Sequence, residues 1–244
     1  MVHAAPTAES AIGYDVSYLD CDTPLPTTFG FALVNVNYGR PFTANPCFRG
    51  EVAWALGGSS QTQPVLSFYL NTSNPGASGS AFWPADGTIT PQICDGSSSA
   101  GCAYDFGWGG AIDAFSRAVD VVGPSTATAS QWWLDVETAN SWSEDQALNV
   151  QALLGGVDAL HAQGVAQVGI YATKAHWTEI TGASRSSSTV NAPFAGLPNW
   201  IPRLGPLDAA ADHCVASESL TGGPVQMVQY EFFLDKNVAC SIET

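Results

Sequence analysis

The chain has 244 residues, of which 45% are hydrophobic and only 12% are charged. This length and apolar share are enough for one large α/β domain, and α/β barrels often reach this size as a single unit. The formal net charge of −15 argues against nucleic acid and anionic membrane surfaces as partners, and it favours a neutral substrate.

Short apolar segments alternate with helical patterns along the chain, which predicts a parallel sheet with helical crossovers. A helix is expected over residues 109–122, and a second one from the capping box at 143–146 to Gly164. Loops rich in Gly, Ser, Asn and Pro are expected at 71–108 and 181–198. The expected strands are residues 12–17, 31–36, 65–70, 132–137, 168–171, 199–201 and 225–230.

These elements favour an α/β fold, a single irregular (β/α) TIM-like barrel with long loops on its carboxyl-end face. Residues 1–11 are interpreted as an N-terminal extension and residues 12–244 as the barrel domain. In such barrels the functional groups gather at the carboxyl ends of the strands. Side chains near these ends are therefore the candidates for a site.

Six cysteines, none of them in a C-x-x-C pair, argue against a zinc or redox site. An even number in a chain of this composition predicts disulfides and an oxidising compartment. We favour pairing between neighbours in the sequence, and six buried thiols are the alternative. The favoured pairs are Cys21–Cys47, Cys94–Cys102 and Cys214–Cys240.

A secreted, extracellular protein is expected from these cysteines. No apolar run of about 18 residues is present that would predict a transmembrane helix. The first residues, Met1 to Pro6, are read as the start of a mature chain with an added Met, from which a leader was removed. We expect the protein to act as a monomer.

The segment Trp132–Glu137 is the most informative one, because an apolar aromatic run ends in two acids separated by one residue. In a strand, Asp135 and Glu137 point to the same side. Mutual repulsion and partial burial raise the pKa of at least one carboxyl group. A protonated carboxyl beside an ionised one is what cleavage of a glycosidic bond requires. The alternative is an acidic strand end that only faces solvent.

Two further acids fall near expected strand ends, Asp15 in the first strand and Asp235 after the last. We expect both to meet Asp135 and Glu137 at one rim, although each alone could be a turn or cap residue. Aromatic side chains at a rim can stack on the apolar faces of sugars. The candidates for substrate binding are Tyr38, Tyr171, Tyr230, Trp108 and Trp142, each with core packing as the alternative.

Several motifs in this order resemble glycoside hydrolase family 25, the lysozymes of the Chalaropsis type. The motifs are Gly13-Tyr14-Asp15-Val16-Ser17, Trp133-Leu134-Asp135-Val136-Glu137, Gly169-Ile170-Tyr171, Pro198-Asn199-Trp200-Ile201, Gln229-Tyr230, and Asp235 with Asn237. The resemblance implies an irregular barrel that cleaves β-1,4 links of peptidoglycan, a bacterial cell-wall polysaccharide, with retention.

The family's roles, carried over by position, make Glu137 the general acid, while Asp135 supports a positively charged intermediate. The substrate's own 2-acetamido group would give nucleophilic help, and Asp15 and Asp235 match the remaining rim acids. The sequence departs from the family at Tyr14, at Asn35–Gly39 and between Tyr230 and Asp235. These departures leave open a divergent member that acts on an arabinan, galactan or mannan.

Two hypotheses from other classes compete with hydrolysis. A non-catalytic barrel could bind glycans through its aromatic loops, although carboxylates buried without use are costly to keep. The acids could instead hold a divalent cation, but such cations need six or more oxygen ligands and no D-x-D-x-D-G loop is present. We therefore predict no metal and no cofactor.

Overall fold

A computed structural model describes residues 12–60, 63–87, 89, 93–183, 192–203, 210–230 and 234–240. The predicted N-terminal extension, residues 1–11, and much of the predicted loop at 181–198 lie outside these residues. None of the helices in the described part of the chain has the length and apolar character needed to cross a membrane.

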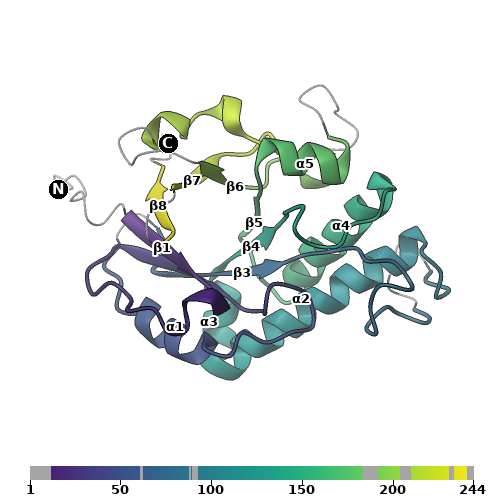
Figure 1. Ribbon diagram of the computed structural model, residues 1–244, viewed down its shortest axis with the longest axis horizontal. Coiled ribbons are helices and arrows are strands. Elements are labelled where there is room, and N and C mark those ends of the chain that lie inside the picture. Colours follow the sequence, from purple (N-terminus) through teal and green to yellow (C-terminus); the bar gives the residue numbers. More distant parts are fainter. Residues whose placement is uncertain are drawn as a thin grey trace.

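The strands close into an eight-stranded barrel in sequence order, with helices outside it (Figure 1). The predicted α/β barrel is thereby confirmed. The strands are β1 (Ile12–Val16), β2 (Phe31–Asn35), β3 (Leu66–Asn71), β4 (Gln131–Asp135), β5 (Val168–Tyr171), β6 (Asn199–Arg203), β7 (Val225–Tyr230) and β8 (Lys236–Ala239). The α-helices are α1 (Phe48–Ala55), α2 (Ala100–Val122), α3 (Pro124–Ala129), α4 (Gln146–Ala162) and α5 (Lys174–Thr181). Short 3-10 helices cover Tyr18–Asp20, Ala192–Phe194, Ala211–His213 and Ala216–Glu218.

Strand β8 makes the barrel irregular, because it runs antiparallel to both of its neighbours, β7 and β1. The other neighbouring strands pair in parallel. Its sequence, Lys-Asn-Val-Ala, is too short and too polar to stand out as a strand. The short helices α1, α3 and α5 were not predicted from the sequence either.

Successive strand residues alternate between the inside of the barrel and the helical layer, as the two-residue period of a strand requires. On β4, for example, Trp133 belongs to the inner cluster while Trp132 and Leu134 pack outside. The inner cluster consists of Phe31, Leu33, Tyr69, Trp133, Tyr171, Trp200 and Met227. These large side chains fill the barrel below its carboxyl end, so the interior is a packed core and not a pore.

Helix α2 begins at Ala100, although residues up to 108 were predicted to be loop. The glycine-rich composition up to residue 108 suggested a loop, but Gly107 serves close packing between α2 and α4. A Cβ at Gly107 would lie 1.8 Å from the carbonyl oxygen of Ala152, and one at Gly155 would lie 2.1 Å from that of Tyr104. The predicted loop position of Trp108 is therefore wrong.

Helix α4 follows the prediction closely except at its cap. The N-cap is Asp145 and not Ser143, and its side chain accepts a hydrogen bond from the backbone N–H of Ala147. The helix ends before Gly164, whose φ of +84° is open to glycine at little cost.

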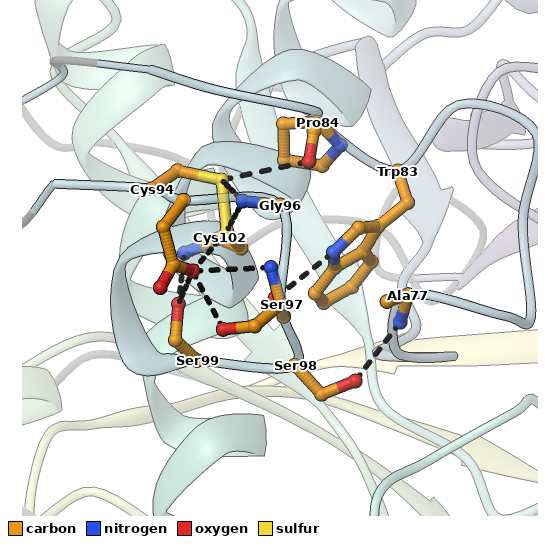
Figure 2. Close-up of a disulfide and its surroundings, with 10 residues drawn as sticks. Ala77, Trp83, Pro84, Cys94, Gly96, Ser97, Ser98, Ser99 and Cys102 are labelled. Carbon is orange, nitrogen blue, oxygen red and sulfur yellow. Dashed lines mark hydrogen bonds between the residues drawn. A yellow bond between two sulfur atoms is a disulfide. The ribbon is translucent and has the colours of Figure 1, made fainter.

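The three favoured disulfides are present: Cys21–Cys47, Cys94–Cys102 and Cys214–Cys240. The first ties the turn after β1 to the start of α1, and the last ties the segment before β7 to the end of β8. The second closes a small loop at the start of α2 (Figure 2).

The close contact between α2 and α4 predicts that alanine destabilises the protein at Gly155, although alanine has the higher helix propensity. Gly155→Ala should lower the free energy of unfolding by about 1–3 kcal/mol, because the new methyl group meets backbone and the helices must separate. Gly50→Ala in α1 is the matched control, since nothing lies within 4 Å of its Cβ position and alanine favours a helix. Urea unfolding measures both, and a stabilised Gly155→Ala variant would contradict the packing argument.

Candidate active site

A cavity of about 240 Å³ opens at the carboxyl end of the barrel, and all four predicted acids line it. Asp15 and Asp135 occupy inward positions on β1 and β4, while Glu137 and Asp235 lie in the following loops. The cavity is also lined by Ser17, Tyr18, Leu19, Gly39, Tyr69, Asn71, Ala139, Asn140, Tyr171, Trp200 and Gln229. Among these described lining residues there is no Lys, Arg or His.

Asp15 is fixed in place by amide groups from β7 and β8. Its carboxyl oxygens accept hydrogen bonds from Gln229 Nε2 at 2.9 and 3.1 Å and from Asn237 Nδ2 at 2.7 Å. Burial, and secondarily the charge of Asp235, raise the pKa of Asp15 from its ordinary 3.8 to about 8. The hydrogen bonds from the two amides lower this pKa in part, but the net value still leaves a proton on Asp15 at neutral pH. The same hydrogen bonds hold its side chain rigidly.

Each of these amides is itself oriented by an aromatic side chain inside the barrel. The Tyr171 hydroxyl donates to Gln229 Oε1 at 2.7 Å, and Trp200 Nε1 donates to Asn237 Oδ1 at 2.7 Å. These bonds fix which end of each amide faces Asp15. Tyr171 and Trp200 therefore position Asp15 indirectly, through Gln229 and Asn237.

Asp135 is 4% exposed and is held on one side only. Its Oδ2 accepts a hydrogen bond from Asn71 Nδ2, whereas its buried Oδ1 has no partner among the described residues. Burial is the main reason why the pKa of Asp135 lies well above its ordinary value, and the charges of Glu137 and Asp15 add to it. Oδ1 is thus a hydrogen-bond acceptor without a protein partner, in a residue that lines the cavity.

Asn71 belongs to a chain of buried amides that continues behind Asp135. Asn35 Nδ2 donates to Asn71 Oδ1 at 3.0 Å, and Asn37 Nδ2 donates to the Asn71 carbonyl at 3.0 Å. Asn45 continues the chain with a 2.8 Å bond to the Asn35 carbonyl. This chain leaves Asn71 little freedom and so fixes the rotamer of Asp135.

Glu137 is half-buried and follows β4 in a loop whose backbone is anchored. Trp142 Nε1 donates to the Glu137 carbonyl at 2.7 Å, and the Asn140 N–H donates to the same oxygen at 3.2 Å. Burial raises the pKa of Glu137, and the nearby His176 offsets part of this rise. A carboxyl group that is raised in pKa yet reachable from the cavity is suited to give up a proton.

Sequence analysis missed the amides Asn71, Gln229 and Asn237 as site residues. The alternation of strand residues could have identified two of them. Asn71 and Gln229 lie near the ends of their strands at inward-facing positions, as Asp15 and Asp135 do. Whether Asn237 faces inward could not be predicted, because β8 was not expected as a strand.

The predicted aromatic residues divide between the cavity and other places. Tyr171 lines the cavity, but Tyr38 is 49% exposed and packs on Tyr18 with ring centroids 4.1 Å apart. Tyr230 points outward from β7 into the helical layer. Trp108 and Trp142 pack on the same outer core, so neither lines the cavity.

Comparisons with known proteins agree with this architecture. A family model described as lysozyme-like protein 1 matches residues 109–193. A glycosyl hydrolase 25 of Streptococcus pneumoniae is similar in structure, with 14% identity, a TM-score of 0.54, and coverage of 96% of this chain and 88% of the other. Comparison with curated protein sequences gave no match.

Two further solved structures are similar over nearly their whole length. A muramidase from Trichobolus zukalii has 16% identity, a TM-score of 0.53, and coverage of 96% of this chain and 95% of its own. A bacterial lysozyme from Streptomyces coelicolor has 16% identity, a TM-score of 0.51, and coverage of 96% and 94%. The barrel has the family 25 fold. The resemblance seen in the sequence motifs is thus confirmed for the fold.

Within this family 25 fold, the cavity acids do not make a recognisable metal centre. In the described part of the chain, the cluster with the spacing of metal ligands is Cys21, Cys47 and Glu51. Its two sulfur atoms are joined in a disulfide, so they cannot act as thiolate ligands.

The raised pKa of Asp15 predicts that stability falls as pH rises. The folded protein keeps this proton up to about pH 8, whereas an unfolded chain releases it near the ordinary pKa of 3.8. Because the folded state binds more protons between these values, the free energy of unfolding decreases across this window. We expect the midpoint of thermal unfolding to be lower at pH 9 than at pH 5 by about 5 °C or more.

Asp15→Asn should remove a large part of this difference, because an amide has no proton to lose. Asp120→Asn, an exposed acid on α2, is the control and should leave the difference unchanged. If the unfolding midpoint fell by the same amount between pH 5 and pH 9 in Asp15→Asn and in the unmodified protein, the assignment to Asp15 would be contradicted.

Proposed function

We propose that the protein is a retaining glycoside hydrolase that cleaves peptidoglycan, with Glu137 as the general acid. The observation that carries the proposal is the cavity itself, where four carboxyl groups from distant parts of the chain meet at the carboxyl end of the barrel. The family 25 fold and the lysozyme-like match support the same substrate class.

In the first step, Glu137 donates its proton to the glycosidic oxygen while the bond from that oxygen to the anomeric carbon breaks. The carbonyl oxygen of the substrate's 2-acetamido group attacks the anomeric carbon and forms a cyclic cation. The unpartnered Oδ1 of Asp135 accepts a hydrogen bond from the acetamido N–H, and this places the carboxyl group where it can stabilise the developing positive charge.

In the second step, water attacks the anomeric carbon from the face that the leaving group vacated. Glu137 takes the water proton and returns to its starting form, and the acetamido group is released unchanged. Two inversions at the anomeric carbon give net retention. Asp15 has a different role, because its hydrogen bonds hold it rigidly as a floor for the cavity.

Secretion is part of the proposal. The three disulfides, Cys21–Cys47, Cys94–Cys102 and Cys214–Cys240, require oxidising conditions to persist, and a wall polymer lies outside the cell. The substrate is therefore reached in the compartment where the fold is stable.

Replacing the general acid tests the assignment of Glu137. Glu137→Gln should lower the rate of peptidoglycan solubilisation by about 10²–10⁴-fold, because the amide keeps the shape but cannot transfer a proton. Glu144→Gln, an exposed acid seven residues further along, is the matched control. Unchanged turnover in a folded Glu137→Gln variant would remove Glu137 as the acid.

The same assay distinguishes the substrate. Mass spectrometry of reduced products identifies the sugar at the new reducing end, and proton NMR during turnover shows the anomer formed first. Release of sugar from arabinogalactan or mannan but not from peptidoglycan would favour a divergent activity. Tight binding without any product would favour a glycan-binding barrel.

Substrate assistance predicts a requirement for the acetamido group. Peptidoglycan with N-deacetylated sugars should be cleaved at least about 10²-fold more slowly than its acetylated form, because the internal nucleophile and the partner of Asp135 Oδ1 are both absent. Re-acetylation of the same preparation should restore the rate. Equal cleavage of both forms would instead indicate a carboxylate nucleophile.

A further inference from the structure

A second hollow of about 460 Å³ adjoins the acidic cavity. The two share Gly39, Ala139 and Asn140 in their walls, so a polymer that enters one can continue into the other. The lining residues of the second hollow also include Arg40, Phe82 and Phe106. Nothing in the function proposed above assigns a role to this hollow.

Phe82 presents an aromatic surface in the second hollow. It is 58% exposed, yet its ring is fixed by stacking on Phe42 with centroids 4.8 Å apart. Phe42 packs in turn on Phe106, at 5.2 Å. An exposed ring on a rigid support can pack against a sugar face at little entropic cost.

The disulfide loop at the start of α2 holds the segment that carries Phe82 (Figure 2). Trp83 Nε1 donates to the Ser97 carbonyl at 3.2 Å, and the Ala77 N–H donates to Ser98 Oγ at 3.0 Å. Both acceptors lie in the loop closed by Cys94–Cys102. The loop closed by the disulfide therefore anchors the residues on either side of Phe82, which lines the second hollow.

Charge differs sharply between the two hollows. Four acids and no cation line the first, whereas Arg40 is the one charged side chain among the described residues that line the second. None of the ion pairs found in the described part of the chain involves Arg40. A chain that spans both hollows must be neutral in the first and can place an anionic group beside Arg40 in the second.

We propose that the second hollow binds a carboxylate-bearing unit of the glycan chain, with the carboxylate at Arg40 and an apolar face on Phe82. This inference rests on the proposed hydrolase function and specifies its substrate. The net charge of −15 favours neutral ligands in general, and Arg40 marks the place where that preference is locally reversed. An arginine can bind a carboxylate through two parallel hydrogen bonds.

Binding to the Glu137→Gln variant tests this without turnover. The probes are soluble peptidoglycan fragments with free carboxylates and the same fragments after conversion of the carboxylates to methylamides, each titrated by calorimetry. We expect the free carboxylate form to bind about 2–5-fold more tightly at low salt, a range typical of an exposed charge pair. The preference should shrink at high ionic strength.

Adding Arg40→Gln should abolish the preference, whereas Arg40→Lys should retain part of it. Phe82→Ala should weaken both fragment forms about equally. Arg49→Gln, an exposed arginine on α1 outside both hollows, is the control and should change neither affinity. The variants can be checked for folding by thermal unfolding.

Equal affinity for the two fragment forms, or a preference that survives Arg40→Gln, would overturn the assignment of Arg40. Absence of binding by either form would overturn it as well. These results are separable from failure of the proposed function, which would show as the absence of wall degradation by the unmodified protein whatever the binding data.

Discussion

The crowding of four carboxyl groups in one cavity without a cationic lining residue is the constraint around which the described structure is organised. Full ionisation would be strongly unfavourable there, because repulsion acts between groups that burial has already deprived of water. Asp15 therefore keeps its proton at neutral pH, and the pKa values of Asp135 and Glu137 are raised as well. The same electrostatics would supply the protonated carboxyl group that we propose as the acid.

Hydrogen bonds divide the acids into fixed and available groups. Asp15 is enclosed by amides that Tyr171 and Trp200 orient, so both of its oxygens are occupied. Asp135 is fixed through one oxygen and free at the other, and Glu137 is anchored through its backbone while its carboxyl group faces the cavity. Carboxyl groups of the same kind thus differ in hydrogen bonding because of their surroundings. One cavity can therefore hold both a structural acid and the acids that we propose to contact the substrate.

The long segment between β3 and α2 adds a second function to the rim. In its described residues, the Cys94–Cys102 disulfide, the Trp83 indole and the stacking of Phe82 on Phe42 tie the segment to its surroundings beside Arg40. Acids at one end of the continuous surface and a guanidinium group at the other would impose a direction on a bound chain. The hollow that we propose for specificity is thereby separated in space from the acid that we propose for bond cleavage.

The sequence by itself determined the strand periods, and with them the convergence of Asp15 and Asp135 inside a parallel barrel. Alternation is a local property, so it can be read from a few neighbouring residues. Neighbouring cysteines also paired as expected. Gly107 was misleading as a loop residue, because it is a glycine in a helix that packs closely on the backbone of another helix. The amides beside the acids, the antiparallel β8 and the hollow beside Arg40 depend on contacts between residues far apart in the chain. Only the closed barrel, which fixes those distances and excludes water, could decide them.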